Sequence, residues 1–415
     1  GGHEIRALDA MAGRLSFQAA LERVAEIGPD LIVSLVGQAS LANDLGFFAR
    51  LKAGFPRARL IVSGDAGFDD TEKLLRENRS IDAVLLDYVS RRWLPYMEKA
   101  YDKAADIAFL DGGRYRARRS APAREYSIGL PRHGLFPYRK YRMPFARALP
   151  YAGVATDFGC PFKCGFCLTG RLPYKLRPVA EVVGELEYLK KLGIRYFSFG
   201  DQTFGADRQR TENLLSAMIG KGLDLPWACF ARADLLDEPA VKLMRRAGCD
   251  LAMIGVESGD QGLLDRYGKG LTIGRIREAF ALCRRLGIRT VATFILGLPG
   301  EIRETAERTV RLALELDPDF ASFNAAVAKP LTPLAAEARL RGWLRPGPAD
   351  QSGSSNLATG NAGPEAVEAW VKKAARRFYL RPGYLMRRLM SMSSFTELGI
   401  NLAEAAALLR GGTRP

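Results

Sequence analysis

The sequence predicts an α/β protein made of two consecutive β/α regions and a helical tail. Short β-branched runs alternate with amphipathic segments over residues 1–110, and the alternation restarts with a longer period over residues 151–340. Apolar strands separated by helices are typical of parallel sheets that helices cover on both faces. The composition agrees, because 47% hydrophobic and 26% charged residues are ordinary for a globular protein with a large core.

The first region, residues 1–110, predicts a doubly wound sheet of the Rossmann or flavodoxin-like kind. The chain starts with GGHEI rather than with methionine, and we expect this domain to be truncated, without its first strand and helix. Ligands of such sheets bind in the loops after the carboxyl ends of the strands. Strands are expected at 4–10, 30–36, 58–65 and 83–88, and helices at 16–27, 43–54 and 70–77.

Residues 111–150 predict a basic linker. Residues 112–150 contain ten Arg or Lys and the single acidic residue Glu125, so they supply +9 of the formal net charge of +15. Five prolines in the same stretch favour an extended connection. A basic chain can bind nucleic acid, but a charge concentrated in a linker favours a solvated segment or an anionic small-molecule ligand. We therefore do not expect a nucleic-acid partner.

The second region, residues 151–340, predicts a partial TIM-like (β/α)6 barrel. In parallel barrels the chemistry gathers at the carboxyl ends of the strands. A Gly-, Pro-, Ser- and Asn-rich stretch, 341–364, predicts a mobile loop, and 365–415 predicts a helical C-terminal region. The strands of the barrel are expected at 153–158, 195–201, 226–232, 251–257, 289–296 and 319–327.

Neither a membrane-spanning stretch nor a signal peptide is found, and the use of cysteine fits a reducing compartment, so we expect a cytoplasmic protein. Half of the six cysteines, Cys160, Cys164 and Cys167, lie in DFGCPFKCGFCL directly after the first barrel strand. The other three are isolated in apolar surroundings, which predicts small buried side chains: Cys229, Cys249 and Cys283.

Three clustered cysteines on a glycine-containing loop indicate a metal or redox site. Thiolates hold zinc or iron–sulfur clusters. Structural zinc takes four ligands, and neither His3 nor His133 has a suitable local spacing. A [4Fe–4S] cube held by three thiolates leaves one iron open for a second cofactor. We favour this cluster over zinc, and over three cysteines that merely fill a turn.

CPFKCGFC at the end of the first strand of a (β/α)6 region resembles the radical S-adenosylmethionine (radical SAM) superfamily. The resemblance implies that Cys160, Cys164 and Cys167 hold a [4Fe–4S] cluster whose open iron binds the amino and carboxylate groups of SAM. It implies that an electron from the reduced cluster splits SAM into methionine and a 5′-deoxyadenosyl radical. A reductant such as flavodoxin or ferredoxin is implied as a partner.

Four later segments resemble the family in its order, each at the carboxyl end of a strand: FSFGDQTFGADR, CFARADLL, MIGVESGD and FILGLPGE. Taken alone, each also fits an ordinary turn or helix start. The resemblance implies SAM contacts by Phe166, Asp201, Arg232, Glu257, Ser258 and Gly297. No residue is assigned a catalytic role.

The front region, the linker, the barrel and the tail with RRFYLRP (376–382) together resemble the branch of the superfamily that carries a cobalamin (B12)-binding domain. The resemblance covers almost the whole chain and implies cobalamin as a cofactor. The chain departs from the pattern because it has no Asp-x-His-x-x-Gly, and Ala66 stands near a usual histidine position. Candidate cobalamin contacts, each equally compatible with an ordinary turn, are Gln38, Ser40, Gly64 and Asp65.

The branch implies a cobalamin-dependent C-methyltransferase in secondary-metabolite, lipid or pigment biosynthesis, acting on a small molecule. An alternative is a cobalamin-independent cyclase, dehydratase or isomerase with a vestigial front domain. A third hypothesis is a tRNA-modifying or nucleic-acid-binding protein, but methylthiotransferases of that kind carry three further cysteines before the motif, and this chain has none there. In the tail, Tyr379 and Arg381 fit either substrate contact or packing.

Overall fold

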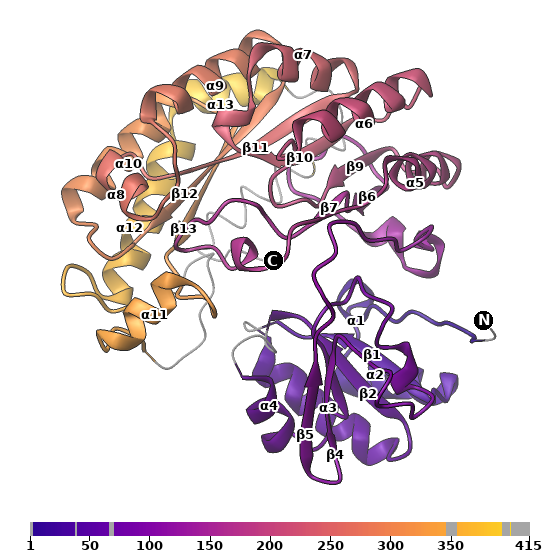
Figure 1. Cartoon of the computed structure of the whole chain (residues 1–415). Helices are drawn as coiled ribbons and strands as arrows, with labels where there is room; N and C mark the ends of the chain where they lie inside the picture. Colours follow the sequence, from indigo (N-terminus) through magenta and orange to yellow (C-terminus); the bar gives the residue numbers. More distant parts are fainter. Residues whose placement is uncertain (1–2, 38–39, 66–69, 346–354, 392–398, 400–415) are drawn as a thin grey trace. The chain divides into compact units, whose positions relative to one another are not determined.

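The computed structural model describes residues 3–37, 40–65, 70–345, 355–391 and 399 (Figure 1). The chain divides into two compact units. Unit 1 comprises Gly1–Ile128 and Gly134–Pro137, and unit 2 comprises Gly129–His133 and Tyr138–Pro415. Within the described residues, no helix has the length and apolar character needed to cross a membrane.

Unit 1 is built on a mixed five-stranded sheet in the order β1-β2-β3-β4-β5. The first three strands are parallel, whereas β4 pairs antiparallel with both β3 and β5. The expectation of a wholly parallel sheet is therefore wrong for the last two strands. Their bounds are β1 (Leu31–Leu35), β2 (Arg59–Ser63), β3 (Ala83–Leu85), β4 (Ile107–Asp111) and β5 (Arg114–Arg118).

A two-residue turn explains this difference. Gly112 and Gly113 join β4 to β5 and have φ of +55° and +84°, the positive values that tight hairpin turns require. The strand expected at 4–10 is also absent. There the Asp9 carboxylate accepts a hydrogen bond from Ala12 N at 2.8 Å and begins a short helix instead.

The three helices expected in unit 1 are present, and the inner strands β2 and β3 of its sheet are buried on both faces. In β2, Leu60 and Val62 pack into the cluster that contains Phe48, and Ile61 packs into the opposite cluster with Tyr96. This two-sided burial accounts for the continuous apolar run that the sequence shows. The helices are α1 (Ala10–Gly13), α2 (Phe17–Ile27), α3 (Leu41–Gly54), α4 (Thr71–Glu77) and the 3-10 helix η2 (Leu94–Tyr96).

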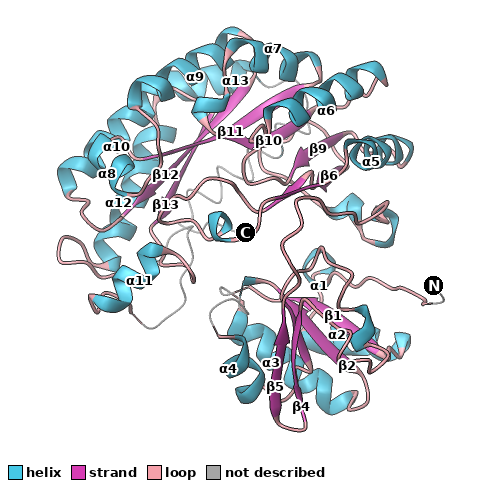
Figure 2. Cartoon of the chain, viewed as in Figure 1, coloured by secondary structure: helices cyan, strands magenta, loops and turns pink. Residues whose placement is uncertain are grey.

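Unit 2 is built on a six-stranded parallel sheet in the order β13-β12-β11-β10-β9-β6, which curves as a partial barrel (Figure 2). All six strands expected in the second region are found. Helices cover the outer, convex face of this sheet (Figure 1). The strands are β6 (Tyr151–Val154), β9 (Tyr196–Phe199), β10 (Trp227–Ala231), β11 (Cys249–Glu257), β12 (Arg289–Leu296) and β13 (Phe320–Ala325).

The helices of unit 2 follow the strands, as the alternation predicts. A separate pair, β7 (Asp157–Phe158) and β8 (Lys175–Leu176), flanks the segment that carries the three clustered cysteines. The helices are α5 (Val179–Lys191), α6 (Arg208–Gly220), α7 (Glu238–Arg246), α8 (Gln261–Arg266), α9 (Ile273–Arg285), α10 (Arg303–Leu316) and α11 (Pro333–Leu340). Short 3-10 turns are η3 (His133–Leu135), η4 (Tyr138–Lys140), η5 (Thr169–Arg171) and η6 (Ala233–Leu235).

The basic segment 111–150 is structured at several points. It begins with β5 of unit 1, so the hairpin crosses the boundary expected at residue 110. Further along, His133 Nε2 lies 2.6 Å from Glu185 Oε1 of α5, and Gly129 O accepts a hydrogen bond of 2.9 Å from Arg177. The end of the segment packs inside unit 2 and forms a floor beneath the sheet.

This floor consists of residues 143–148 at the amino-terminal ends of the strands. Met143 and Ala146 are buried against inward-facing side chains that include Leu251 and Phe320. Arg289 Nη2 donates to Phe145 O at 2.9 Å. The floor closes one end of the inner face of the sheet.

The tail contains two helices, α12 (Pro364–Tyr379) and α13 (Pro382–Ser391); the expected helix beyond them falls outside the described residues. The Tyr379 hydroxyl accepts from Ala321 N at 3.0 Å and donates to Ala321 O at 2.7 Å. It therefore caps backbone groups of the edge strand β13, which supports packing rather than substrate contact. Residues 346–354 of the loop expected at 341–364 are outside the description, and Leu357 beyond them is buried.

Candidate functional site

The clustered cysteines lie on the loop between β7 and η5, directly after the end of β6. Cys160 and Cys164 are each 7% exposed, and Cys167 is half-buried. Cys167 N donates to Cys164 O at 3.1 Å, which gives the loop a turn between these two cysteines. None of the three is in a disulfide.

Glycines allow the loop to fold tightly onto its neighbours. Gly159 has φ +80°, and a Cβ there would lie 2.4 Å from Pro173 O. Gly165 N donates to Tyr267 O at 2.7 Å, and Gly165 O accepts from Leu334 N at 3.1 Å. These backbone contacts fix the loop to the segment after α8 and to the first turn of α11.

The three thiols provide the kind of donor set that holds an iron–sulfur cluster. Within the described ranges, no three or more Cys, His, Asp or Glu side chains gather closely enough to hold one metal ion. Zinc draws all of its ligands to about 2.0–2.3 Å from one centre, whereas a cube binds each thiolate to a different iron. Three free thiols on one tightly folded loop therefore fit a [4Fe–4S] cluster.

Polar groups from distant strands reach the thiols. Cys160 Sγ lies 3.5 Å from Thr203 Oγ1, and Arg232 Nη1 lies 3.8 Å from Cys164 Sγ. Burial raises the pKa of the Cys164 thiol, and the charges of Lys269 and Arg232 oppose that rise. The site thus supplies positive charge to a thiolate.

Asp201 is fully engaged within the protein. It is 2% exposed and accepts hydrogen bonds from Thr156 N and Thr156 Oγ1, both at 2.6 Å, and from Asp157 N at 3.0 Å. It therefore ties the end of β9 to the chain after β6. Burial and the charge of Asp201 raise the pKa of Asp157 to about 9. A contact between Asp201 and SAM remains a prediction.

Glu257 and Ser258 end β11 in two different ways. Glu257 has φ +67°, and its Oε1 accepts from Lys269 Nζ at 2.6 Å. Ser258 is 1% exposed, and its hydroxyl accepts from Asp260 N at 3.1 Å. Glu257 is therefore a charged group at the strand ends, whereas Ser258 holds the turn before α8.

Gly297 and Phe166 lie in packed surroundings. Gly297 has φ +88°, and a Cβ there would lie 2.6 Å from Val367 Cγ2 of α12. The close approach that this glycine permits is thus to the tail helix. Phe166 is half-buried, with its ring centroid 6.3 Å from that of Tyr267. Their predicted SAM contacts stay predictions.

Sequence reasoning missed Thr156, Thr203 and Lys269, although Thr203 lies within the recognised segment FSFGDQTFGADR. Lys269 is 5% exposed and stands between Gly268 and Gly270, whose φ values are +61° and +66°. A lysine between two glycines at the end of a helix is the signal that could have found it. The position of Thr203 two residues after Asp201 could have drawn attention to it, whereas no comparable local signal marks Thr156.

In unit 1, three of the four candidate cobalamin residues lie after β1 and β2. Ser40 Oγ donates to Asp44 Oδ2 at 2.6 Å, and Gly64 has φ +134° with a Cβ position only 2.1 Å from Val36 O. A Cβ on Gly37 would lie 3.5 Å from Ser40 Oγ and 3.7 Å from Asp65 Oδ1. The two strand-end loops thus meet at Gly37. Gln38 lies outside the described residues.

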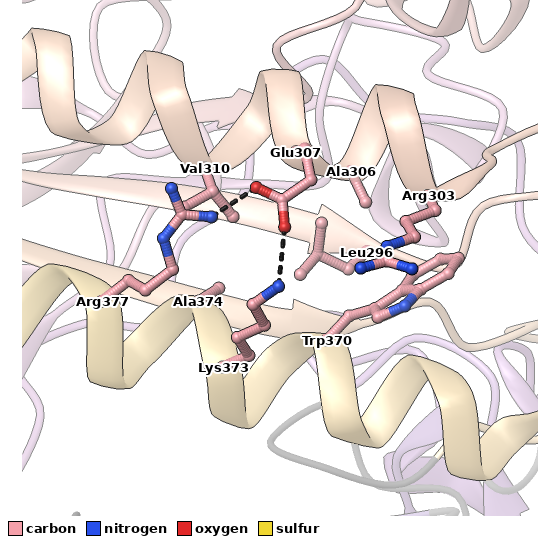
Figure 3. A pocket seen from close by; sticks show the side chains of 9 residues that line it. All are labelled: Leu296, Arg303, Ala306, Glu307, Val310, Trp370, Lys373, Ala374 and Arg377. Atoms are coloured by element: carbon pink, nitrogen blue, oxygen red, sulfur yellow. Dashed lines mark hydrogen bonds and ion pairs between the residues drawn. The ribbon is translucent and has the colours of Figure 1, made fainter.

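A small pocket between α10 and α12 lies apart from this site (Figure 3). Glu307 at its centre pairs with Lys373 at 2.9 Å and also with Arg377. These ion pairs join the two helices, so the pocket belongs to the packing of the tail. It is lined by Leu296, Arg303, Ala306, Glu307, Val310, Trp370, Lys373, Ala374 and Arg377.

Comparison with known proteins agrees with this site. Residues 156–313 match the family model of the radical SAM superfamily. The chain is 27% identical over 413 residues to an uncharacterized methyltransferase of Pyrococcus horikoshii, which covers 95% of this chain and 88% of the relative. It is 28% identical over 350 residues to the anaerobic magnesium-protoporphyrin IX monomethyl ester cyclase of Cereibacter sphaeroides, covering 80% of this chain and 57% of the cyclase.

A solved structure shares the fold. The radical SAM methyltransferase TsrM of Kitasatospora setae, with cobalamin and a [4Fe–4S] cluster bound, superposes with a TM-score of 0.68 at 19% identity, over 91% of this chain and 76% of that one. Another structure of TsrM holds tryptophan and a SAM analogue. Residues 156–313 belong to the radical SAM superfamily, and the chain is a radical SAM enzyme. Membership implies a [4Fe–4S] cluster and SAM as cofactors.

Proposed function

We propose that this chain is a cobalamin-dependent radical SAM methyltransferase that acts on a small molecule. The observation that carries the proposal is the pairing of a three-thiol loop in unit 2 with a separate β/α unit whose strand-end loops meet at Gly37. The Pyrococcus relative and TsrM are both named as methyltransferases, which supports methyl transfer, and the cobalamin in TsrM supports the second cofactor.

The chain's own residues would have distinct tasks. The thiolates of Cys160, Cys164 and Cys167 would hold the cluster, which when reduced supplies the electron that splits SAM. Lys269 and Glu257 would present a fixed pair of opposite charges at the strand ends. SAM itself carries both an ammonium and a carboxylate group, so such a pair could orient it. The floor at residues 143–148 would exclude water from the opposite end of the inner face.

The inner face above the floor suits an uncharged group. Gly255 of β11 is in register with Thr293 of β12, which is in register with Ser322 of β13, and all three are half-buried. Their partial exposure differs from the buried row Met253–Val291–Phe320 one step below. Phe230 of β10 presents a ring that is 42% exposed. We propose this surface as the place for the reacting part of the substrate.

Anaerobic reconstitution with iron, sulfide and cobalamin tests the proposal. We expect four irons and one cobalt per chain. With SAM and a reductant, formation of both 5′-deoxyadenosine and S-adenosylhomocysteine is the expected signature of methyl transfer through radical chemistry. Absence of cobalt and of S-adenosylhomocysteine would contradict it.

The second candidate is a radical SAM cyclase without methyl transfer, and the 28% identity to the magnesium-protoporphyrin cyclase favours it. The same experiment separates the two. A cyclase would form 5′-deoxyadenosine without S-adenosylhomocysteine.

A further inference from the structure

Arg232 places its guanidinium against the cysteine loop. It follows β10, is 5% exposed, and its Nη1 lies 3.8 Å from Cys164 Sγ. Its Cζ lies 3.9 Å from the centroid of Phe162, a ring within the cysteine motif itself. The side chain thus contacts both a cluster thiol and the loop that carries it.

The other nitrogens of Arg232 are committed to protein acceptors. Nε donates to Asp234 Oδ1 at 3.1 Å. Nη2 donates to Asp234 Oδ2 at 3.1 Å and to Lys269 O at 2.7 Å. A guanidinium has five N–H groups, so with the bond to Cys164 four of them have acceptors within the protein. The family resemblance implies a SAM contact by Arg232, but this occupancy leaves no pair of free N–H groups with which the guanidinium could bind a carboxylate of SAM.

We propose that Arg232 is a positioning residue for the iron–sulfur cluster rather than a ligand of SAM. Asp234 and Lys269 O hold the guanidinium in place, Phe162 stacks on it, and Nη1 directs an N–H at the Cys164 sulfur. This inference rests on the radical SAM assignment and not on methyl transfer or cobalamin.

The physical effect follows from charge. Reduction of the cluster adds one negative charge, and hydrogen bonds and positive charge beside a cluster sulfur stabilise that charge. The low exposure of Arg232 limits screening by solvent. Arg232 therefore raises the reduction potential of the cluster and makes it easier to reduce.

The test compares the full chain, anaerobically reconstituted, with three variants: R232Q, R232K and R308Q. R232Q removes the positive charge and the planar set of guanidinium N–H donors, whereas R232K keeps a positive charge without that planar set. R308Q removes the same charge from α10, where the Arg308 side chain is 54% exposed and pairs with Asp260. The readouts are iron content, the midpoint potential of the cluster without SAM by EPR-monitored redox titration, and the affinity for SAM by equilibrium dialysis.

We expect R232Q to make the equilibrium constant for one-electron reduction of the cluster at least tenfold less favourable. This change corresponds to a midpoint potential that is lower by about 59 mV. R232K should fall between R232Q and the unmodified chain, and R308Q should match the unmodified chain. SAM affinity should change less than twofold in all three.

A potential that stays unchanged in R232Q, or a tenfold loss of SAM affinity at unchanged potential, would overturn the proposal and return Arg232 to the SAM site. If R232Q does not retain four irons, R232K decides, because equal potentials of R232K and the unmodified chain would also overturn it. The iron content, the cluster potential and the SAM affinity do not depend on cobalamin or on methyl transfer. These measurements would therefore still test Arg232 if the reconstituted chain bound no cobalt or transferred no methyl group.

Discussion

The acidic side chains at the strand ends differ in how their burial is compensated. Asp201 accepts three hydrogen bonds, and Glu257 pairs with Lys269. Glu301, which is 1% exposed, accepts a hydrogen bond from Gly297 N, but its other carboxylate oxygen has no hydrogen-bond partner within the described residues. Burial raises the pKa of Glu301 to about 8, so this carboxyl is protonated in the folded chain at neutral pH.

Glu301 makes stability depend on pH with a definite sign. Its pKa is near 4.5 when unfolded and about 8 when folded, so the folded state holds the extra proton between these values. The free energy of unfolding therefore falls as pH rises from about 5 to 8.

The variant E301Q keeps an acceptor for Gly297 N but cannot titrate. Its free energy of unfolding should fall less over this pH range, as measured by denaturant unfolding. E304Q on the exposed start of α10 is the control; an equal pH slope in E301Q and the unmodified chain would contradict the assignment.

The six cysteines should separate into two functional groups. Replacing Cys160, Cys164 or Cys167 by Ala should remove most of the iron from the reconstituted chain. C283A is the matched control, because Cys283 is fully buried in the outer core of the barrel. It should keep four irons and lose about 1–2 kcal/mol of unfolding free energy. Iron retention in all of the first three variants would argue against the cluster site.

Among the elements, the cysteine loop depends most directly on backbone geometry. G159A places a Cβ 2.4 Å from Pro173 O at φ +80°. Gly205 has a similar φ of +88° but open space around its Cβ position. G205A should therefore cost only backbone strain, about 1 kcal/mol, and keep its iron.

We expect G159A to lose iron as well as stability, because the loop must shift away from the segment before β8. Iron analysis and thermal unfolding of both variants check this. Equal iron contents in G159A and G205A would show that the close contact does not matter for the cluster.

Elements were predictable where local pattern and tertiary structure agree. The six barrel strands follow from short apolar or aromatic runs that alternate with helical segments, and the tail helix α12 begins at Pro364, a residue that favours helix starts. The segment at 4–10 failed because Asp9 caps a helical turn, a local hydrogen bond that outweighs the apolar alternation. The hairpin of β4 and β5 was missed because its Gly112–Gly113 turn was read as the start of a linker.

In the molecule as a whole, the division into two units predicts that iron and cobalt can be lost independently. G64A places a Cβ 2.1 Å from Val36 O and should disturb the loops after β1 and β2. We expect it to lose cobalt and keep four irons, whereas C160A should do the reverse. Metal analysis of the reconstituted chains checks both. Joint loss of the two metals in G64A would contradict independent sites.

The site was only partly predictable because it combines local and long-range information. The cysteine spacing is local, so the three thiols were found from the motif alone. Thr203 lies beside the Cys160 thiol, and the charge of Lys269 acts on the Cys164 thiol, only because the segments that follow β9 and β11 converge at one edge of the folded sheet. Arg232 was identified by its motif, but its partners Phe162 and Lys269 O, which determine what it can do, come from other segments.

The floor formed by residues 143–148 has a consequence for the order of events. Met143 and Ala146 fill the amino-terminal end of the inner face, so this end is closed to SAM and substrate. We therefore expect both molecules to enter past the carboxyl ends of the strands. If they share that entrance, whichever enters last confines the other, so binding and release should be sequential, and spent cofactor should not leave before the molecule that covers it.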